Sequence, residues 1–371
     1  MKRRDFVTGI GAGALTAGLA GCAGEQSAAP GAECADGPVR TWKMVTTWPP
    51  NFPGLGRGAA NVARRIEEVS GGRIKVHVYA AGELVPPFEV FDAVSQGTAE
   101  LGHGAAYYWK GKVEAGQFFT AIPFGLNSHE MNGWLFYGGG MDLWRETYAP
   151  FNLVPHAAGN TGVQMGGWFN KPIETVADLE GLKMRIPGLG GEVLRRAGGT
   201  PVSLPGGEIF TALQTGNIDA TEWVGPYNDV AFGLNKAARY YYYPGWHEPG
   251  PTLECIVNKD AWDSLPPDLQ AVIAVASQSV NNDMRAEFAY RDAEALQTIL
   301  DDPDIEVRRF PQPVLERLKE ITRELLDEMS ARDPLIARIR ASQEAFLEHS
   351  AVFQGITERA YLEARDGPVD L

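Results

Sequence analysis

Six residues in glycine-rich and aromatic surroundings carry the chemistry that this sequence offers. They are Asn160, Gln164, Arg185, Glu222, Trp223 and Glu248, each at or near the expected end of a helix or strand. Arg185 stands in a strand pattern where an apolar side chain would be expected, so its guanidinium must find a carboxylate or carbonyl partner. That partner is either a group of the chain itself, which makes an internal ion pair, or a ligand.

Glu222 and Glu248 would repel one another in a shared cleft unless a cation lay between them. Glu248 ends an aromatic run, Tyr240–Glu248, which is equally consistent with simple core packing. Glu222 precedes Trp223 in a Gly- and Pro-rich segment. The residue types therefore indicate either a cation held by two carboxylates or two acidic residues placed apart.

Motifs for covalent or metal-assisted catalysis are absent from the sequence. It contains no G-x-S-x-G, H-E-x-x-H or C-x-x-C motif and no Walker loop. None of the six histidines forms an i, i+3 or i, i+4 pair, which argues against a histidine metal site on one helix. The glycines of residues 54–58 open a helix and either form a plain turn or cradle an anion.

The expected elements form an α/β fold with a parallel sheet. Residues 41–47 predict a strand, residues 57–70 predict an amphipathic helix, and apolar residues alternate with polar ones over 74–79. A strand, a helix and a strand at this spacing make a βαβ unit.

An internal repeat suggests two similar lobes. Residues 89–100 and 208–219 share the pattern E-[VI]-F-x-A-[VL]-x-x-G-x-x-[ED], 119 residues apart. Chance similarity is the alternative, because a helix that stops at glycine is common. Each copy predicts a short helix followed by a short strand. Because ligands of open α/β sheets bind beyond the carboxyl ends of the strands, this register predicts a cleft lined by Tyr107, Tyr108, Glu222 and Trp223.

Two helical blocks follow. Residues 267–301 predict one helix, and ~35 residues at ~1.5 Å each make a rod of roughly 50 Å that can span both lobes. A second block begins after Pro313 and carries an apolar stripe that packs either on its own lobe or on a second subunit. The stripe consists of Leu315, Leu318, Ile321, Leu325 and Met329.

The N-terminus predicts export to the cell envelope. Residues 1–21 resemble a twin-arginine (Tat) signal, and Leu19–Cys22 resembles a bacterial lipobox in which Cys22 carries the lipid. The alternative is an ordinary signal with a chance cysteine. Residues 22–39 predict a flexible tether. Cys34 and Cys255 then remain, either free or paired with each other.

Composition excludes several classes of protein. Beyond residue 22 no run of ~18 apolar residues occurs, which excludes a polytopic membrane protein. The formal net charge of the 371 residues is −14, and it becomes −16 without residues 1–21, which carry three basic residues and one acidic residue. Nucleic acids and anionic lipid surfaces are therefore poor partners. A small anionic ligand would need a local positive centre.

Several segments, in order, resemble the substrate-binding proteins of TRAP (tripartite ATP-independent periplasmic) transporters. They are Gly82–Pro86, Lys183–Pro187 and Gly216–Pro226. Asn160–Trp168 and Tyr242–Trp246 are similar to the branch of that family that binds 2-oxo acids or lactate. The resemblance covers about residues 40–300.

The resemblance implies a two-lobed flytrap in which Arg185 takes the ligand carboxylate as a bidentate pair. It implies a cation held by Glu222, by the Trp223 carbonyl and by Glu248; oxygen ligands suit Na⁺ or Ca²⁺. The remaining hydrogen bonds would come from Asn160, Gln164, Tyr107 and Tyr108. His247 stands where the resemblance implies a second aromatic residue, so the resemblance does not define the outer wall of the pocket or the size of the ligand.

The resemblance and the elements together divide the chain into expected segments. These are the signal (1–21), the tether (22–39), lobe 1 (40–159), lobe 2 (160–250), a crossover strand and spanning helix shared by both lobes (251–312), and C-terminal helices (313–371) that the family branch uses for dimers.

The leading functional hypothesis is a periplasmic or envelope receptor, not an enzyme, that closes on a small carboxylate such as pyruvate or lactate and delivers it to TRAP permease subunits. The alternative is a metal-dependent envelope lyase or hydratase that uses Glu222 as a base. A third hypothesis is a ligand-sensing module that contacts a signalling partner.

Overall fold

The structure is a computed structural model that describes residues 38–367. The expected export signal, Cys22 and Cys34 lie outside the described residues. Within residues 38–367, no helix combines the length and the apolar character needed to cross a membrane. Cys255 is buried with a free thiol, and burial raises the pKa of that thiol to about 12.

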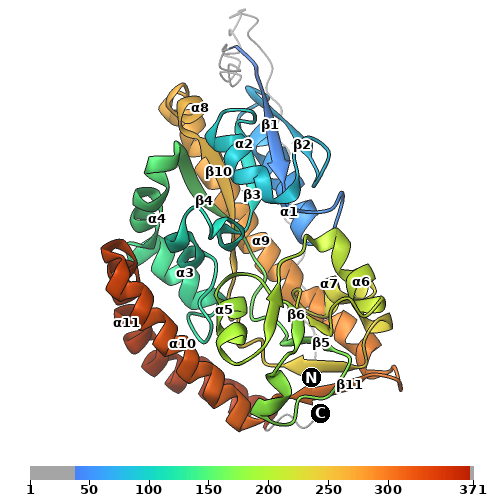
Figure 1. The fold of residues 1–371 in the computed structure, drawn as a ribbon. Helices are drawn as coiled ribbons and strands as arrows, with labels where there is room; N and C mark the ends of the chain where they lie inside the picture. The colour runs from blue at the N-terminus through green and yellow to red at the C-terminus, as the bar shows by residue number, and fades with distance from the viewer. Residues whose placement is uncertain (1–37, 368–371) are drawn as a thin grey trace, which may run out of the picture. The chain divides into compact units, whose positions relative to one another are not determined.

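Two sheets form the frame of the molecule (Figure 1). The first sheet has the order β2-β1-β3-β10-β4, with β1 (Arg40–Thr46), β2 (Ile74–Tyr79), β3 (Leu101–Gly104), β4 (Leu153–Asn160) and β10 (Thr252–Asn258). The second has the order β11-β9-β5-β8-β6-β7, with β5 (Gly167–Phe169), β6 (Lys183–Arg185), β7 (Thr200–Val202), β8 (Ala220–Thr221), β9 (Tyr240–Tyr243) and β11 (Glu306–Arg309).

The two sheets repeat one topology, which confirms the repeat seen in the sequence. In the first sheet, β1 is parallel to both β2 and β3, and β3 is antiparallel to β10. In the second, β6 is parallel to both β7 and β8, and β8 is antiparallel to β5. The repeated helices are α2 (Val90–Ser95) and α6 (Gly206–Gln214), and each is followed by a glycine with positive φ, Gly97 and Gly216.

The βαβ unit expected at the start of the chain is present. Helix α1 (Leu55–Val69) lies between β1 and β2 and buries the apolar face that contains Val62 and Ile66. Each expected boundary agrees with the observed one within two residues.

One long helix joins the two lobes. Helix α9 (Pro267–Leu300) has 34 residues, which makes it about 50 Å long. It packs against β4 and α1 of the first lobe and against α7 (Pro226–Phe232) of the second. The expected spanning helix is therefore confirmed, and the long orange helix in Figure 1 shows its course.

The remaining helices cover the outer faces. They are α3 (Ser128–Tyr137), α4 (Gly140–Tyr148), α5 (Gly188–Arg196), α8 (Lys259–Asp263), α10 (Gln312–Arg332), α11 (Pro334–Gln354) and α12 (Ala360–Asp366), with a short 3₁₀ helix η2 (Ala106–Trp109). Helix α10 packs on α5 and α11, and α11 packs on α3 and α4. The stripe from Leu315 to Met329 is buried in these contacts, so it packs within its own chain.

Candidate functional site

The candidate site lies at the edge where the carboxyl ends of β3 and β8 meet. Tyr107 and Tyr108 follow β3 in η2, while Glu222 and Trp223 follow β8 directly. The amino end of the antiparallel strand β10 reaches the same edge, and Glu248 precedes it. The cleft expected at this edge thus has Tyr107, Tyr108 and Trp223 in its lining, whereas Glu222, which was also expected to line it, lies behind the wall.

A tight cavity lies between the lobes at this edge, and only about 10 Å³ of it is open to the centre of a water-sized sphere. That is room for about one water molecule. Its walls come from both lobes: Trp48, Leu55, Tyr107, Tyr108, Thr161, Gln164, Trp223, Val224, Glu248, Pro251 and Leu253. A larger groove, of about 150 Å³ by the same measure, lies between residues 122–126 and the helices α10 and α11. We place the site in the smaller cavity because the buried charges gather there.

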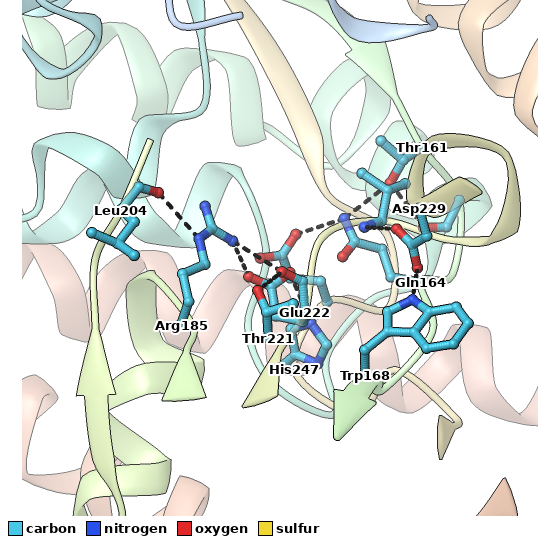
Figure 2. A network of polar contacts seen from close by, with 12 residues as sticks. Thr161, Gln164, Trp168, Arg185, Leu204, Thr221, Glu222, Asp229 and His247 are labelled. Carbon is cyan, nitrogen blue, oxygen red and sulfur yellow. Dashed lines mark hydrogen bonds and ion pairs between the residues drawn. The ribbon is translucent and has the colours of Figure 1, made fainter. Parts of the chain in front are cut away.

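Arg185 forms a buried ion pair with Glu222, and both side chains are 1% exposed. The Arg185 Nε also donates to the Leu204 carbonyl (3.2 Å), and Nη2 lies 3.4 Å from the Tyr108 hydroxyl. Its guanidinium stands 5.1 Å from the centre of the Trp223 ring. Figure 2 shows Glu222 directly beside Arg185. The internal ion pair, one of the two alternatives for Arg185, is therefore present in the structure. It lies against Tyr108 and Trp223 of the cavity wall.

The second carboxylate, Glu248, is held by Gln164. The Gln164 Nε2 donates to the Glu248 carboxylate at 2.8 Å and lies 3.4 Å from the Thr161 hydroxyl. The chain after β9 can approach the backbone of Gln164 closely because Gly245 has no side chain. A Cβ at Gly245 would lie 2.2 Å from the Gln164 carbonyl oxygen. Burial, and then the neighbouring Glu222, raise the pKa of Glu248 well above its ordinary value.

Burial also raises the pKa of both tyrosines in η2, so Tyr107 and Tyr108 remain neutral hydroxyl donors at physiological pH. Burial alone would lower the pKa of Arg185, but the adjacent Glu222 carboxylate raises it above its ordinary value. The cavity wall thus combines the acidic Glu248 with neutral donors, and the Arg185–Glu222 ion pair lies directly behind it.

Three side chains could hold a cation here. Ligand atoms of Glu222, His247 and Glu248 all lie within 4.8 Å of one another, and the three residues are buried. The His247 Nε2 is 3.4 Å from Glu222. Among residues 38–367, the Gln164 Oε1 and both His247 ring nitrogens are buried without a hydrogen-bond partner. Two carboxylates and a spare amide oxygen fit a hard cation such as Na⁺ or Ca²⁺.

Asn160 lies at this edge, at the end of β4, but its amide is engaged by the chain. Its Nδ2 donates to the Gly250 carbonyl (3.1 Å), and its Oδ1 accepts from the Gly162 N–H (2.9 Å). It does not line the cavity. The structure therefore brings together Tyr107, Tyr108, Gln164, Trp223 and Glu248 at the cavity, with Arg185 and Glu222 immediately behind it.

Sequence reasoning missed Trp48, which lines the cavity from the loop after β1. Its indole N–H donates to the His103 Nδ1 at 2.8 Å, and the other ring nitrogen of His103 lies 3.3 Å from the Ala158 carbonyl. Burial lowers the pKa of His103 to about 4, so this ring is neutral. Trp48 follows the carboxyl end of a parallel strand, so the edge rule would have found it.

The lobes touch each other across the cavity. Phe52 of the first lobe stacks on Phe232 of the second, with ring centres 4.1 Å apart. The Asn228 amide donates to the Pro53 carbonyl at 3.1 Å, and the Lys110 ammonium donates to the Gly188 carbonyl at 3.3 Å. These contacts close the site and involve groups outside the cavity lining.

Comparisons with known proteins show the family of this chain. The family model of bacterial extracellular solute-binding protein, family 7, matches residues 44–333. A relative from Nostoc sp., described as a monocarboxylate 2-oxoacid-binding periplasmic protein, is 41% identical over 361 residues, which are 97% of this chain and 98% of the relative.

Two solved TRAP periplasmic solute-binding proteins have similar folds. One, from Pseudoalteromonas atlantica, holds sodium and pyruvate; the other, from Colwellia psychrerythraea, holds calcium and pyruvate. Each is 42% identical with a TM-score of 0.86, and each match covers 88% of this chain and 100% or 99%, respectively, of the solved chain. The chain therefore belongs to family 7 of the bacterial extracellular solute-binding proteins, the TRAP receptor family that its motifs resemble.

Proposed function

We propose that this protein is the receptor of a TRAP transporter that binds a small monocarboxylate, a 2-oxo acid such as pyruvate or else lactate, together with Na⁺ or Ca²⁺, and delivers it to membrane permease subunits. The observation that carries the proposal is the buried Arg185–Glu222 pair directly behind a small cavity between two lobes, with Glu248 in the cavity wall. The ligands of the Nostoc, Pseudoalteromonas and Colwellia proteins support it.

In this proposal Arg185 binds the ligand carboxylate, and Tyr107, Tyr108 and Gln164 donate hydrogen bonds to the ligand. Glu222, Glu248 and the backbone carbonyl of Trp223 hold the cation, which supplies positive charge near the oxygens of the ligand. Asn160, whose amide already binds Gly162 and Gly250, shapes the wall of the site.

Glu222 has two roles that couple the cation to the carboxylate. It is the partner of Arg185 in the structure, and it is a candidate cation ligand. When Glu222 holds a cation, Arg185 needs another anion, and the ligand supplies one. Each of the two solutes therefore favours binding of the other, and this linkage is reciprocal.

Charge balance ties the choice of cation to the protonation state of Glu248. With Glu248 ionised, one guanidinium and two carboxylates give the buried group a net charge of −1, and a bound monocarboxylate makes it −2. A divalent cation brings this total to zero, which matters because an unbalanced charge is costly in a buried site. Sodium reaches the same balance when Glu248 is protonated, and the raised pKa of Glu248 favours that state.

A receptor role is favoured over a lyase or hydratase. A general base must be free to take a proton, whereas the Glu222 carboxylate is paired with Arg185 and fully buried.

We further propose that the protein works at the cell envelope, anchored through a lipid on Cys22 after Tat export. The lipobox pattern at Leu19–Cys22 supports this proposal.

A homodimer through the C-terminal helices is a separate proposal. The last part of α11, the π-helical turn Gly355–Arg359 and the helix α12 expose a row of apolar side chains, each at least 46% accessible. They are Val352, Phe353, Ile356, Tyr361 and Leu362. Exposed apolar patches of this kind mark interaction sites.

The proposed ligand is tested by thermal unfolding of the protein with pyruvate, longer 2-oxo acids, lactate or a dicarboxylate, each with and without Na⁺ and Ca²⁺. A ligand at ~100 times its dissociation constant stabilises the folded state by ~2.7 kcal/mol. We expect stabilisation by a monocarboxylate only when a cation is present. Stabilisation by the dicarboxylate alone would contradict the ligand class.

Closure of the lobes is tested by Phe232→Ala, which removes the ring stacked on Phe52; the same ring also contacts Trp223, with ring centres 4.9 Å apart. We expect about 2- to 10-fold weaker ligand binding by calorimetry, since aromatic pairs contribute ~0.5–1.5 kcal/mol and 1.4 kcal/mol is tenfold. Phe136→Ala, on the partly buried face of α3, is the matched control and lowers stability without changing affinity. Equal affinity in both variants would show that this contact does not favour the closed state.

A further inference from the structure

Each lobe holds a buried carboxylate that is bonded to a tryptophan and a tyrosine and lies away from the proposed ligand and cation. Asp229 lies on α7 and Glu254 lies on β10, and they are 1% and 0% exposed. Each accepts hydrogen bonds from one tryptophan indole and one tyrosine hydroxyl. Burial raises the pKa of both carboxyl groups to about 7, because in the described part of the chain no basic side chain is bonded to either of them.

Asp229 connects the second sheet to the segment that carries the proposed cation ligands. Its Oδ2 accepts from the Trp168 Nε1 (3.0 Å) and the Tyr241 hydroxyl (2.7 Å), side chains of two paired strands. Its Oδ1 accepts from the backbone N–H of Val224 at 3.2 Å. Val224 directly follows Trp223. Figure 2 shows Trp168 pointing its indole nitrogen at Asp229.

The same segment also fixes Gln164. The N–H of Met165, the residue after Gln164, donates to the Val224 carbonyl at 2.9 Å. Both backbone groups of Val224 are therefore engaged, one by Asp229 and one by the chain beside Gln164. Displacement of Val224 would move the Trp223 carbonyl and Gln164 together.

Glu254 makes the corresponding connection in the first lobe. Its Oε1 accepts from the Trp109 Nε1 at 2.6 Å, and its Oε2 accepts from the Tyr148 hydroxyl at 2.8 Å. Trp109 is the last residue of η2, the helix that carries Tyr107 and Tyr108. Glu254 thus ties the two cavity tyrosines to β10.

An amide cannot replace these carboxylates without loss. Three N–H or O–H donors point at Asp229 and two at Glu254, and a carboxylate accepts all of them. An asparagine or glutamine has one oxygen and one NH₂ group, so its NH₂ group would face a donor. A same-size substitution therefore releases one of the connected segments.

We propose that Asp229 and Glu254 are positioning residues with separate tasks, Asp229 holding the segment Glu222–Val224 for the cation and Glu254 holding Tyr107 and Tyr108 for the carboxylate. This inference rests on the proposed function. It assigns cation affinity to one lobe and part of the carboxylate affinity to the other.

The test compares Asp229→Asn with Glu254→Gln in two titrations: Ca²⁺ alone, followed by tryptophan fluorescence, and pyruvate at saturating Ca²⁺, followed by calorimetry. Asp229→Asn is expected to weaken Ca²⁺ binding about 10-fold and to change pyruvate binding at saturating Ca²⁺ less than 3-fold. Glu254→Gln is expected to show the opposite pattern. Equal changes in both titrations for both variants, or no change in either, would overturn the proposal.

The two variants are each other's structural control, because each removes one buried carboxylate bonded to a Trp and a Tyr. A purely structural role would lower the unfolding midpoint and leave the ratio of the two affinities unchanged. Should either variant fail to fold, Tyr241→Phe and Tyr148→Phe remove one donor each and predict the same patterns with smaller changes. If the wild type binds Ca²⁺ but no carboxylate, the proposed ligand fails, while the Ca²⁺ titration still decides the role of Asp229.

Discussion

Arg185→Met is expected to weaken binding of pyruvate by about 100-fold or more. Truncating one partner of a buried, hydrogen-bonded charge pair costs ~2–5 kcal/mol in binding. Arg185 is the basic side chain next to the cavity that already touches Tyr108 and Trp223. Calorimetry at saturating Ca²⁺ measures the loss directly.

The design of this experiment must separate binding from folding. Arg185→Met leaves the buried Glu222 carboxylate without its partner, which destabilises a protein by ~3–5 kcal/mol. The double variant Arg185→Met with Glu222→Gln removes both charges and is expected to recover most of the stability but no affinity. Arg185→Lys keeps the charge and loses the planar fork, so its affinity should be intermediate. A folded double variant with the affinity of the wild type would refute the role of Arg185.

Glu222→Gln is expected to remove the dependence of ligand binding on Na⁺ or Ca²⁺. The substitution takes away one of two carboxylates that face the proposed cation and also frees Arg185 from its internal partner. At saturating cation the variant should bind pyruvate more weakly than the wild type does. Without cation its affinity for pyruvate should be at least equal to that of the wild type. Calorimetric titrations at several cation concentrations give both quantities.

Glu208→Gln is the matched control, because Glu208 is an exposed glutamate on α6 of the same lobe. It should leave both the affinity and its cation dependence unchanged. The cation proposal fails if Glu222→Gln keeps the full cation dependence of the wild type, or if removal of cations by chelation and ion exchange does not affect the wild type.

The sequence predicted the parts of the site that follow from strand direction. The repeat placed β3 and β8 in equivalent positions of the two sheets, and the residues after their carboxyl ends include Tyr107, Tyr108 and Trp223 of the cavity wall, as expected. Glu222, which was also expected in that wall, lies behind it. Arg185 stood out because a guanidinium in a strand pattern requires a partner. The sequence could not show whether that partner is Glu222 or a ligand. Glu222 is 37 residues away in the chain, and a ligand carboxylate satisfies the same requirement.

Other features depend on loop paths and side-chain rotamers, which residue patterns do not define. His247 lies beside Glu222 and Glu248, in a segment whose Gly245 N–H donates to the Gln164 carbonyl. Asn160 turned its amide to Gly162 and Gly250 and away from the cavity. Glu254, however, interrupts the apolar strand β10 as Arg185 does β6, so the same reasoning applied to Glu254 would have predicted a buried, partnered carboxylate.

The most direct test of the central claim is a crystal structure of the protein grown with pyruvate and Ca²⁺. The account predicts the pyruvate carboxylate on the Arg185 guanidinium and the cation on Glu222 and Glu248, in the cavity between the lobes. Pyruvate bound elsewhere, with the Arg185–Glu222 pair intact and no cation beside Glu248, would contradict it.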